Sequence, residues 1–121
     1  RRVLFRSALG KIQSSQGKIT QLAWKQQLTE NKIRAEVQDS VSALIAAFER
    51  VEQLRRSLDF AKRLVVAEQR SFDLGNSDLL RVALQEAAAL DAEILLIDAL
   101  ADYFRAQADY RAALGENSPL P

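Results

Sequence analysis

Apolar residues in the middle of the chain recur with a seven-residue period. From residue 37 onward, every seventh residue is apolar: Val37, Leu44, Val51, Leu58, Val65 and Phe72. A repeat of this length, held over many turns, indicates a left-handed coiled-coil seam rather than an isolated surface helix. The second apolar position of the heptads is occupied by Val41, Phe48, Leu54 and Ala61. Two consecutive steps of three residues, from Phe48 to Val51 to Leu54, predict a local overwinding of the supercoil.

A short break follows this pattern. No Pro interrupts residues 8–74, so we expect one long helix over this range. Gly75 suits the left-handed backbone conformation that ends many helices. Asn76 or Ser77 can then cap a following helix, with Asp78 in its first turn, where the helix dipole stabilises a carboxylate. The sequence therefore predicts a helix end and a new helix start within a few residues.

The positions of the predicted elements define the fold. We expect a tip turn at residues 75–76, a second helix over 77–114 and a C-terminal tail over 115–121, which contains a Gly and both prolines. A connection this short places the two helices antiparallel. The predicted fold is all-α, a long antiparallel two-helix coiled-coil hairpin whose first helix is much longer than the second.

The second helix carries two apolar faces. Folding the chain about residues 75–76 places Phe48 opposite Phe104 and leaves residues 8–36 without a partner in the chain. This register predicts that the side facing the first helix holds Leu80, Ala87, Leu90, Ile94, Ile97, Ala101, Phe104 and Ala108. A second face, well over 90° away at about 100° per residue, holds Leu84, Leu95, Ala99, Tyr103 and Tyr110. Because a two-helix hairpin buries only one of these faces, the other predicts assembly with further helices.

An acidic line runs between the two faces. It consists of Asp91, Asp98, Asp102 and Asp109, at spacings of seven, four and seven residues. These carboxylates are explained by a solvated helix surface, or alternatively by the acidic wall of a water-filled, tunnel-lining surface that attracts cations. Ca²⁺ or Mg²⁺ binding is disfavoured because no loop geometry or backbone ligand accompanies them.

The composition argues against catalysis and against bound cofactors. Cys, His and Met are all absent, which removes the ligands of most zinc, copper, haem and iron-sulfur sites. The serines have no His to activate them, and no Gly-rich phosphate loop is present. We therefore expect no enzyme activity, no metal and no cofactor. The apolar runs are also too short for a membrane-spanning helix, which needs roughly 20 residues.

The charge distribution suggests a basic arm only at first sight. Residues 1–34 hold eight of the 17 Lys and Arg but one of the 16 Asp and Glu. However, residues 1–7 match, letter for letter, an in-frame translation of a widely used sequencing-adapter oligonucleotide. We expect them to be a non-native leader, without which acidic residues outnumber basic ones. The prediction is therefore that the chain binds no nucleic acid.

Several short segments together carry a family resemblance. Their centre is Phe72, two residues, Gly75, and a helix start of the form Leu-Leu-x-Val ending at Val82. The other segments are Ile33-Arg34-Ala35-Glu36-Val37, Leu90-Asp91-Ala92-Glu93 and Tyr110-Arg111-Ala112-Ala113-Leu114-Gly115. In this order and spacing the chain resembles the TolC-like outer-membrane efflux proteins over most of residues 8–115.

The resemblance implies a function and a set of partners. In that family three protomers form a periplasmic tunnel of long helices on a β-barrel in the outer membrane of Gram-negative bacteria. The hairpin turn meets a periplasmic adaptor attached to an inner-membrane transporter. The implied docking tip consists of Leu74, Gly75, Asn76, Ser77, Asp78, Leu79 and Leu80. An ordinary capped turn explains the same residues without a partner. The resemblance further implies a homotrimer whose membrane contact lies in the barrel, outside this segment.

One position departs from the family pattern. Arg81 stands where many members have Asp, so an acidic ring closing the tunnel is not carried over. We expect Arg81 to be an exposed residue that forms an ion pair with Asp or Glu on a neighbour. Two alternatives to the export channel remain open, which are the α-hairpin of a periplasmic adaptor and a cytosolic structural coiled coil.

Overall fold

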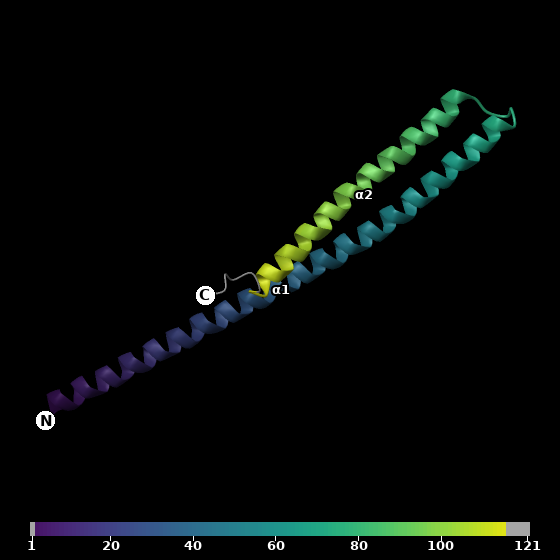
Figure 1. The fold of residues 1–121 in the computed structure, drawn as a ribbon. Coiled ribbons are helices and arrows are strands. Elements are labelled where there is room, and N and C mark those ends of the chain that lie inside the picture. Colours follow the sequence, from purple (N-terminus) through teal and green to yellow (C-terminus); the bar gives the residue numbers. More distant parts are fainter. Residues whose placement is uncertain (1, 116–121) are drawn as a thin grey trace. The chain divides into compact units, whose positions relative to one another are not determined.

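The computed structural model describes residues 2–115, with side chains from Leu4 onward, and consists of two α-helices (Figure 1). The first, α1, spans Arg2–Asp73 and has 72 residues. The second, α2, spans Leu79–Ala113 and has 35 residues. No strand occurs in this part of the chain. The predicted all-α hairpin with a longer first helix is therefore confirmed.

The element boundaries differ slightly from the predicted ones. Helix α1 begins within the suspected leader, at Arg2 rather than at residue 8, which does not test the origin of residues 1–7. Helix α2 begins at Leu79 and not at residue 77, because Asp78 is the capping residue. Most of the expected tail, residues 116–121, lies outside the described residues.

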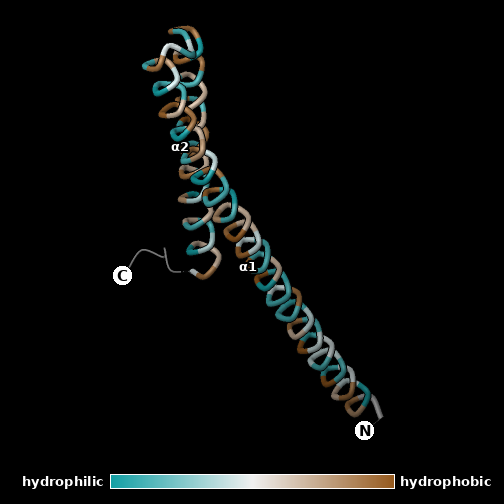
Figure 2. The backbone as a smooth tube through the Cα atoms, turned by 90° about the vertical axis from the view of Figure 1, so that its right-hand side faces the viewer, coloured by the Kyte–Doolittle hydropathy of each residue, from teal (hydrophilic) through white to brown (hydrophobic). Residues whose placement is uncertain are grey.

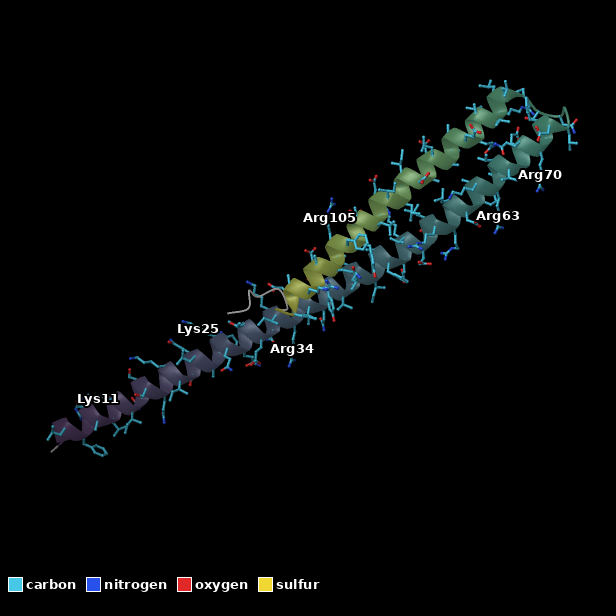
Figure 3. All side chains as sticks on the ribbon, viewed as in Figure 1. Lys11, Lys25, Arg34, Arg63, Arg70 and Arg105 are labelled. Carbon is cyan, nitrogen blue, oxygen red and sulfur yellow. The ribbon has the colours of Figure 1, made fainter. Side chains whose placement is uncertain are left out.

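The chain divides into two compact units, Arg1–Gln38 and Asp39–Pro121. In the described part of the first unit, every side chain from Leu4 to Glu36 is exposed. Its lysines stand seven residues apart, at Lys11, Lys18, Lys25 and Lys32 (Figure 3). A helix that buries none of its side chains gains little stability from packing.

The hairpin forms within the second unit. Here α1 and α2 run side by side in opposite directions in both views, joined by the turn after Asp73 (Figures 1 and 2). On α1 the residues shielded along this seam are Val41, Leu44, Ala47, Val51, Leu54, Leu58, Ala61 and Val65. The predicted heptads of the first helix are therefore largely confirmed. The exceptions are Phe48, whose place on the seam is taken by Ala47, and Phe72, which is exposed.

On α2 the seam is not the predicted one. Its shielded residues follow alternating steps of three and four, as in a coiled coil. They are Val82, Gln85, Ala89, Ala92, Leu96, Ala99, Tyr103, Ala106, Tyr110 and Ala113. The predicted set, from Leu80 to Ala108, is exposed instead. The prediction was wrong because it assigned the larger apolar residues to the seam, whereas half of the seam residues in the structure are alanines, which permit close approach of two helix backbones.

The register of the two helices is nevertheless close to the predicted one. The ring of Phe48 lies 6.1 Å, centroid to centroid, from that of Tyr103, the neighbour of its predicted partner Phe104. Nearer the turn, the amide of Gln69 donates a 3.5 Å hydrogen bond to Glu86. The error of the sequence prediction was therefore a rotation of α2 about its own axis and not a slide along α1.

Candidate functional site

The turn between the helices is a well-defined C-terminal capping motif. The N–H of Asn76 donates to the carbonyl of Ser71 at 2.8 Å, and the N–H of Gly75 donates to that of Phe72 at 2.9 Å. Gly75 has a φ of +81°. This pair of bonds around a left-handed glycine is the Schellman motif, which satisfies carbonyls that the end of a helix leaves unpaired.

The start of α2 is fixed by side chains of the same segment. The Asp78 carboxylate accepts a 2.8 Å hydrogen bond from the N–H of Arg81, so Asp78 is the N-cap. The Ser77 hydroxyl donates to the Glu68 carboxylate of α1 at 2.6 Å. These contacts correct the expectation that Asn76 or Ser77 caps the helix. Ser77 instead ties the turn to α1, a role that sequence spacing does not reveal.

Gly75→Ala is expected to destabilise the hairpin by about 1 kcal/mol, because an L-residue is strained in the left-handed region. A Cβ at position 75 meets no atom within 4 Å, so backbone strain is the only cost. Urea unfolding followed by far-UV circular dichroism measures this loss. Gly17→Ala is the matched control, since position 17 is equally open but helical. It is expected to stabilise the helix, and an equal loss in both variants contradicts the assignment.

Asp78→Ala is expected to cost about 1 kcal/mol of unfolding free energy through loss of the N-cap. Asp78→Asn keeps a capping oxygen and is expected to lose far less. The same unfolding measurement on both variants separates the cap from the charge. Equal destabilisation by Ala and Asn would assign the effect to the ion pair with Arg81, whose nitrogen Nε lies 3.8 Å from Asp78.

The tip carries exposed leucines on this ordered frame. Leu74, Leu79 and Leu80 have 77%, 70% and 68% of their surface exposed. The structure thus brings all seven predicted tip residues together around one turn, with polar atoms engaged in capping and leucine side chains left in solvent. An exposed apolar cluster held by a rigid turn is suited to binding a protein surface.

Arg81 forms its ion pair within its own turn. Both its side chain and that of Asp78 are largely exposed. Such an exposed ion pair adds between a few tenths of a kcal/mol and about 1 kcal/mol to the free energy of unfolding. This pair lies within one turn, whereas the expected acidic partner lay on a neighbour, so that expectation stays a prediction.

The four aspartates of the acidic line are all exposed on α2. Asp102 forms an ion pair of 3.2 Å with Arg105, on its own helix. No group of three His, Cys, Asp or Glu side chains among the described residues is arranged to hold a metal ion. Neither described helix has a stretch long and apolar enough to cross a membrane.

The apolar face that α2 leaves uncovered is the largest feature outside the tip. Its residues are Leu80, Ala83, Ala87, Leu90, Ile94, Ile97, Ala101, Phe104 and Ala108, here called the α2 outer stripe. All are exposed, and Ile97 and Phe104 are 58% and 61% exposed. Figure 2 shows apolar stretches along the whole of α2. One apolar face is therefore left over, but it is the face predicted to meet α1. Of the face predicted to be left over, Ala99, Tyr103 and Tyr110 lie on the seam, whereas Leu84 and Leu95 are exposed.

Comparisons with protein-family models, with curated proteins and with solved structures found no match. The interpretation of the site therefore depends on the geometry of the hairpin and on the sequence pattern.

Proposed function

We propose that the chain forms part of the periplasmic tunnel of a homotrimeric, TolC-like export channel in the outer membrane of a Gram-negative bacterium. Its turn is the tip that docks to a periplasmic adaptor, and through it to an inner-membrane transporter. The observation that carries this proposal is the cluster of exposed Leu74, Leu79 and Leu80 on a turn fixed by the Schellman motif and the Asp78 cap. This role requires no catalytic group, metal or cofactor.

The energetics of the tip favour docking by apolar contact. A leucine side chain moved fully from water into an interface contributes about 1.5 to 3 kcal/mol. Because the turn is already ordered by hydrogen bonds, little conformational entropy is lost when a partner covers it. Three leucines presented in this way are enough for a specific but reversible contact.

The uncovered α2 outer stripe supports the tunnel part of the proposal. In a wall of adjacent helices each helix has neighbours on two sides, and α2 has one apolar face for α1 and one for another helix. Asp102 and Asp109, which lie between these faces, would then border water, as part of the acidic lining considered from the sequence.

The tip is tested by binding of the purified chain to immobilised α-hairpins of periplasmic adaptors, measured by biolayer interferometry. The Leu79→Asp and Leu80→Asp double variant is expected to abolish binding, because it puts charge at the centre of the apolar contact. Phe104→Asp is the matched control, since it changes an equally exposed apolar residue far from the turn.

Saturable binding that is lost only in the tip variant supports the proposal. Absence of binding to every adaptor, or equal loss in the control, contradicts it. Binding to the hairpins of export channels instead of adaptors would favour the alternative in which this chain is itself an adaptor hairpin.

A further inference from the structure

The α2 outer stripe is itself a complete second heptad seam. Its members follow alternating steps of three and four from Leu80 to Ala108, the same spacing as the seam that contacts α1. At about 100° per residue it lies roughly 150° around α2 from that seam. Scattered surface apolar residues do not produce this periodicity, so the stripe indicates a second helix partner.

Acidic side chains border this stripe. Asp91 and Asp98 each follow a large stripe residue, Leu90 and Ile97, by one position. Among the described residues neither carboxylate has a hydrogen bond or an ion pair. On the other border, Glu86 and Glu93 line a shallow groove between the helices together with Lys62 of α1. A helix that covers the stripe is therefore expected to carry positive charge at its margin.

Helix α1 of the hairpin has a surface with this complementary character. Steps of three and four residues connect Ser57, Phe60, Leu64, Ala67 and Ser71 of α1 with Leu74 directly after the helix, a set here called the α1 outer stripe. Phe60 and Leu74 are among its largely exposed members. At about 100° per residue this stripe lies roughly 100° around α1 from the hairpin seam.

Arginines border the α1 outer stripe at seven-residue intervals. Arg56, Arg63 and Arg70 occupy one row, and Figure 3 shows Arg63 and Arg70 pointing away from α2. Arg63 and Arg70, with Ala67 between them, line a shallow groove on the outer side of α1. A row of arginines beside an apolar stripe matches a row of aspartates beside another, because opposite charges at the margin of a helical seam select the partner.

We propose that the α2 outer stripe of one copy packs against the α1 outer stripe of a second copy at the same level, with Asp91 facing Arg63 and Asp98 facing Arg56. The contact joins two different surfaces, so it is heterologous and leaves a free stripe on each copy for the next one. The two stripes are not on diametrically opposite sides of the hairpin. Each added copy is therefore rotated in the same direction relative to the copy before it, as a closed ring requires. This contact would join neighbouring copies in the wall of the proposed channel, so it rests on the proposed function.

Charge reversal tests the contact in the full chain. The acid-reversed variant is Asp91→Lys with Asp98→Lys, and the base-reversed variant is Arg56→Glu with Arg63→Glu. Each variant alone opposes like charges across the contact, so its self-association is expected to weaken at least about tenfold. An equimolar mixture of the two restores opposite charges at every contact and is expected to associate as tightly as the unaltered chain.

Analytical ultracentrifugation measures association, and circular dichroism of each variant checks that its helices remain folded. The matched control is Asp102→Lys with Asp109→Lys, two aspartates at the same spacing on α2 that do not border the outer stripe. It is expected to leave self-association unchanged. Equal weakening in this control, or a mixture no tighter than its components, overturns the proposal.

The same variants separate this inference from the proposed function. Adaptor binding by the tip does not involve the reversed residues, so it is expected to be unchanged in all of them. Intact tip binding without the predicted charge rescue would disprove the contact alone. Charge rescue without adaptor binding would confirm the contact and leave the tip proposal contradicted.

Discussion

Ala99→Asp is expected to open the hairpin, because Ala99 is 1% exposed at the centre of the seam. A carboxylate there is taken out of water without a partner, which costs about 3 kcal/mol or more. Because Ala99 is almost fully enclosed, the larger side chain also has no room without displacing its neighbours. Most of the stability of a helix in a protein comes from packing of its apolar face, which α2 would lose. Far-UV circular dichroism with urea is therefore expected to show loss of the cooperative transition.

Ala101→Asp is the matched control for this experiment. Position 101 lies two residues away on the same helix but belongs to the exposed α2 outer stripe. The same substitution there is expected to change the unfolding free energy by no more than about 0.5 kcal/mol. The sequence pattern alone places Ala101 in the seam, so it predicts that Asp at position 101 costs more unfolding free energy than Asp at position 99. A larger loss at position 101 than at 99 would therefore refute the orientation of α2.

The first helix and the turn were predictable because single local signals define them. The seven-residue spacing from Leu44 to Val65 identifies the seam of α1, and Gly75 marks the turn. Each of these two signals predicts a single structure. No other face of α1 within the hairpin is as regularly apolar, and a helix end in the left-handed conformation favours glycine. Two predicted members fail: Phe48 gives way to the adjacent Ala47, and Phe72, at the end next to the turn, is exposed.

The rotation of α2 was not predictable from apolarity alone. Two heptad patterns are interleaved on this helix, one rich in alanine and one with larger residues such as Leu90 and Ile97. Residue size favours burying the second pattern, whereas close backbone approach favours the first. The alanines at 89, 92, 99 and 106 were the signal that could have identified the seam, since small residues recurring along one face of a helix permit that approach.

The tip residues were predicted as a set, but their individual roles were not. Ser, Asn and Asp all cap helices well, so three adjacent candidates could not be ranked by type. The structure assigns the cap to Asp78, and Ser77 is engaged by Glu68, which lies nine residues earlier. A contact across the turn of this kind depends on the path of the backbone. Docking to an adaptor stays a prediction.

A double variant of the α2 outer stripe, Ile97→Ser with Phe104→Ser, is expected to abolish self-association while leaving the hairpin intact. Both side chains are more than half exposed in the single chain, so their loss removes little from its own stability. In an interface each contributes about 1.5 kcal/mol or more, which together corresponds to a weakening of roughly a hundredfold. Sedimentation equilibrium measures the association, and urea unfolding measures the stability of the hairpin.

Leu95→Ser is the control for the single Ile97→Ser change. Leu95 is about as exposed as Ile97, but it lies on the other side of α2, outside the outer stripe. General loss of surface apolarity would weaken association equally in both variants. A defined helix partner on the outer stripe requires a large effect at Ile97 and almost none at Leu95. Equal effects would mean that association is nonspecific, and neither a ring nor a tunnel wall could then be built from this helix.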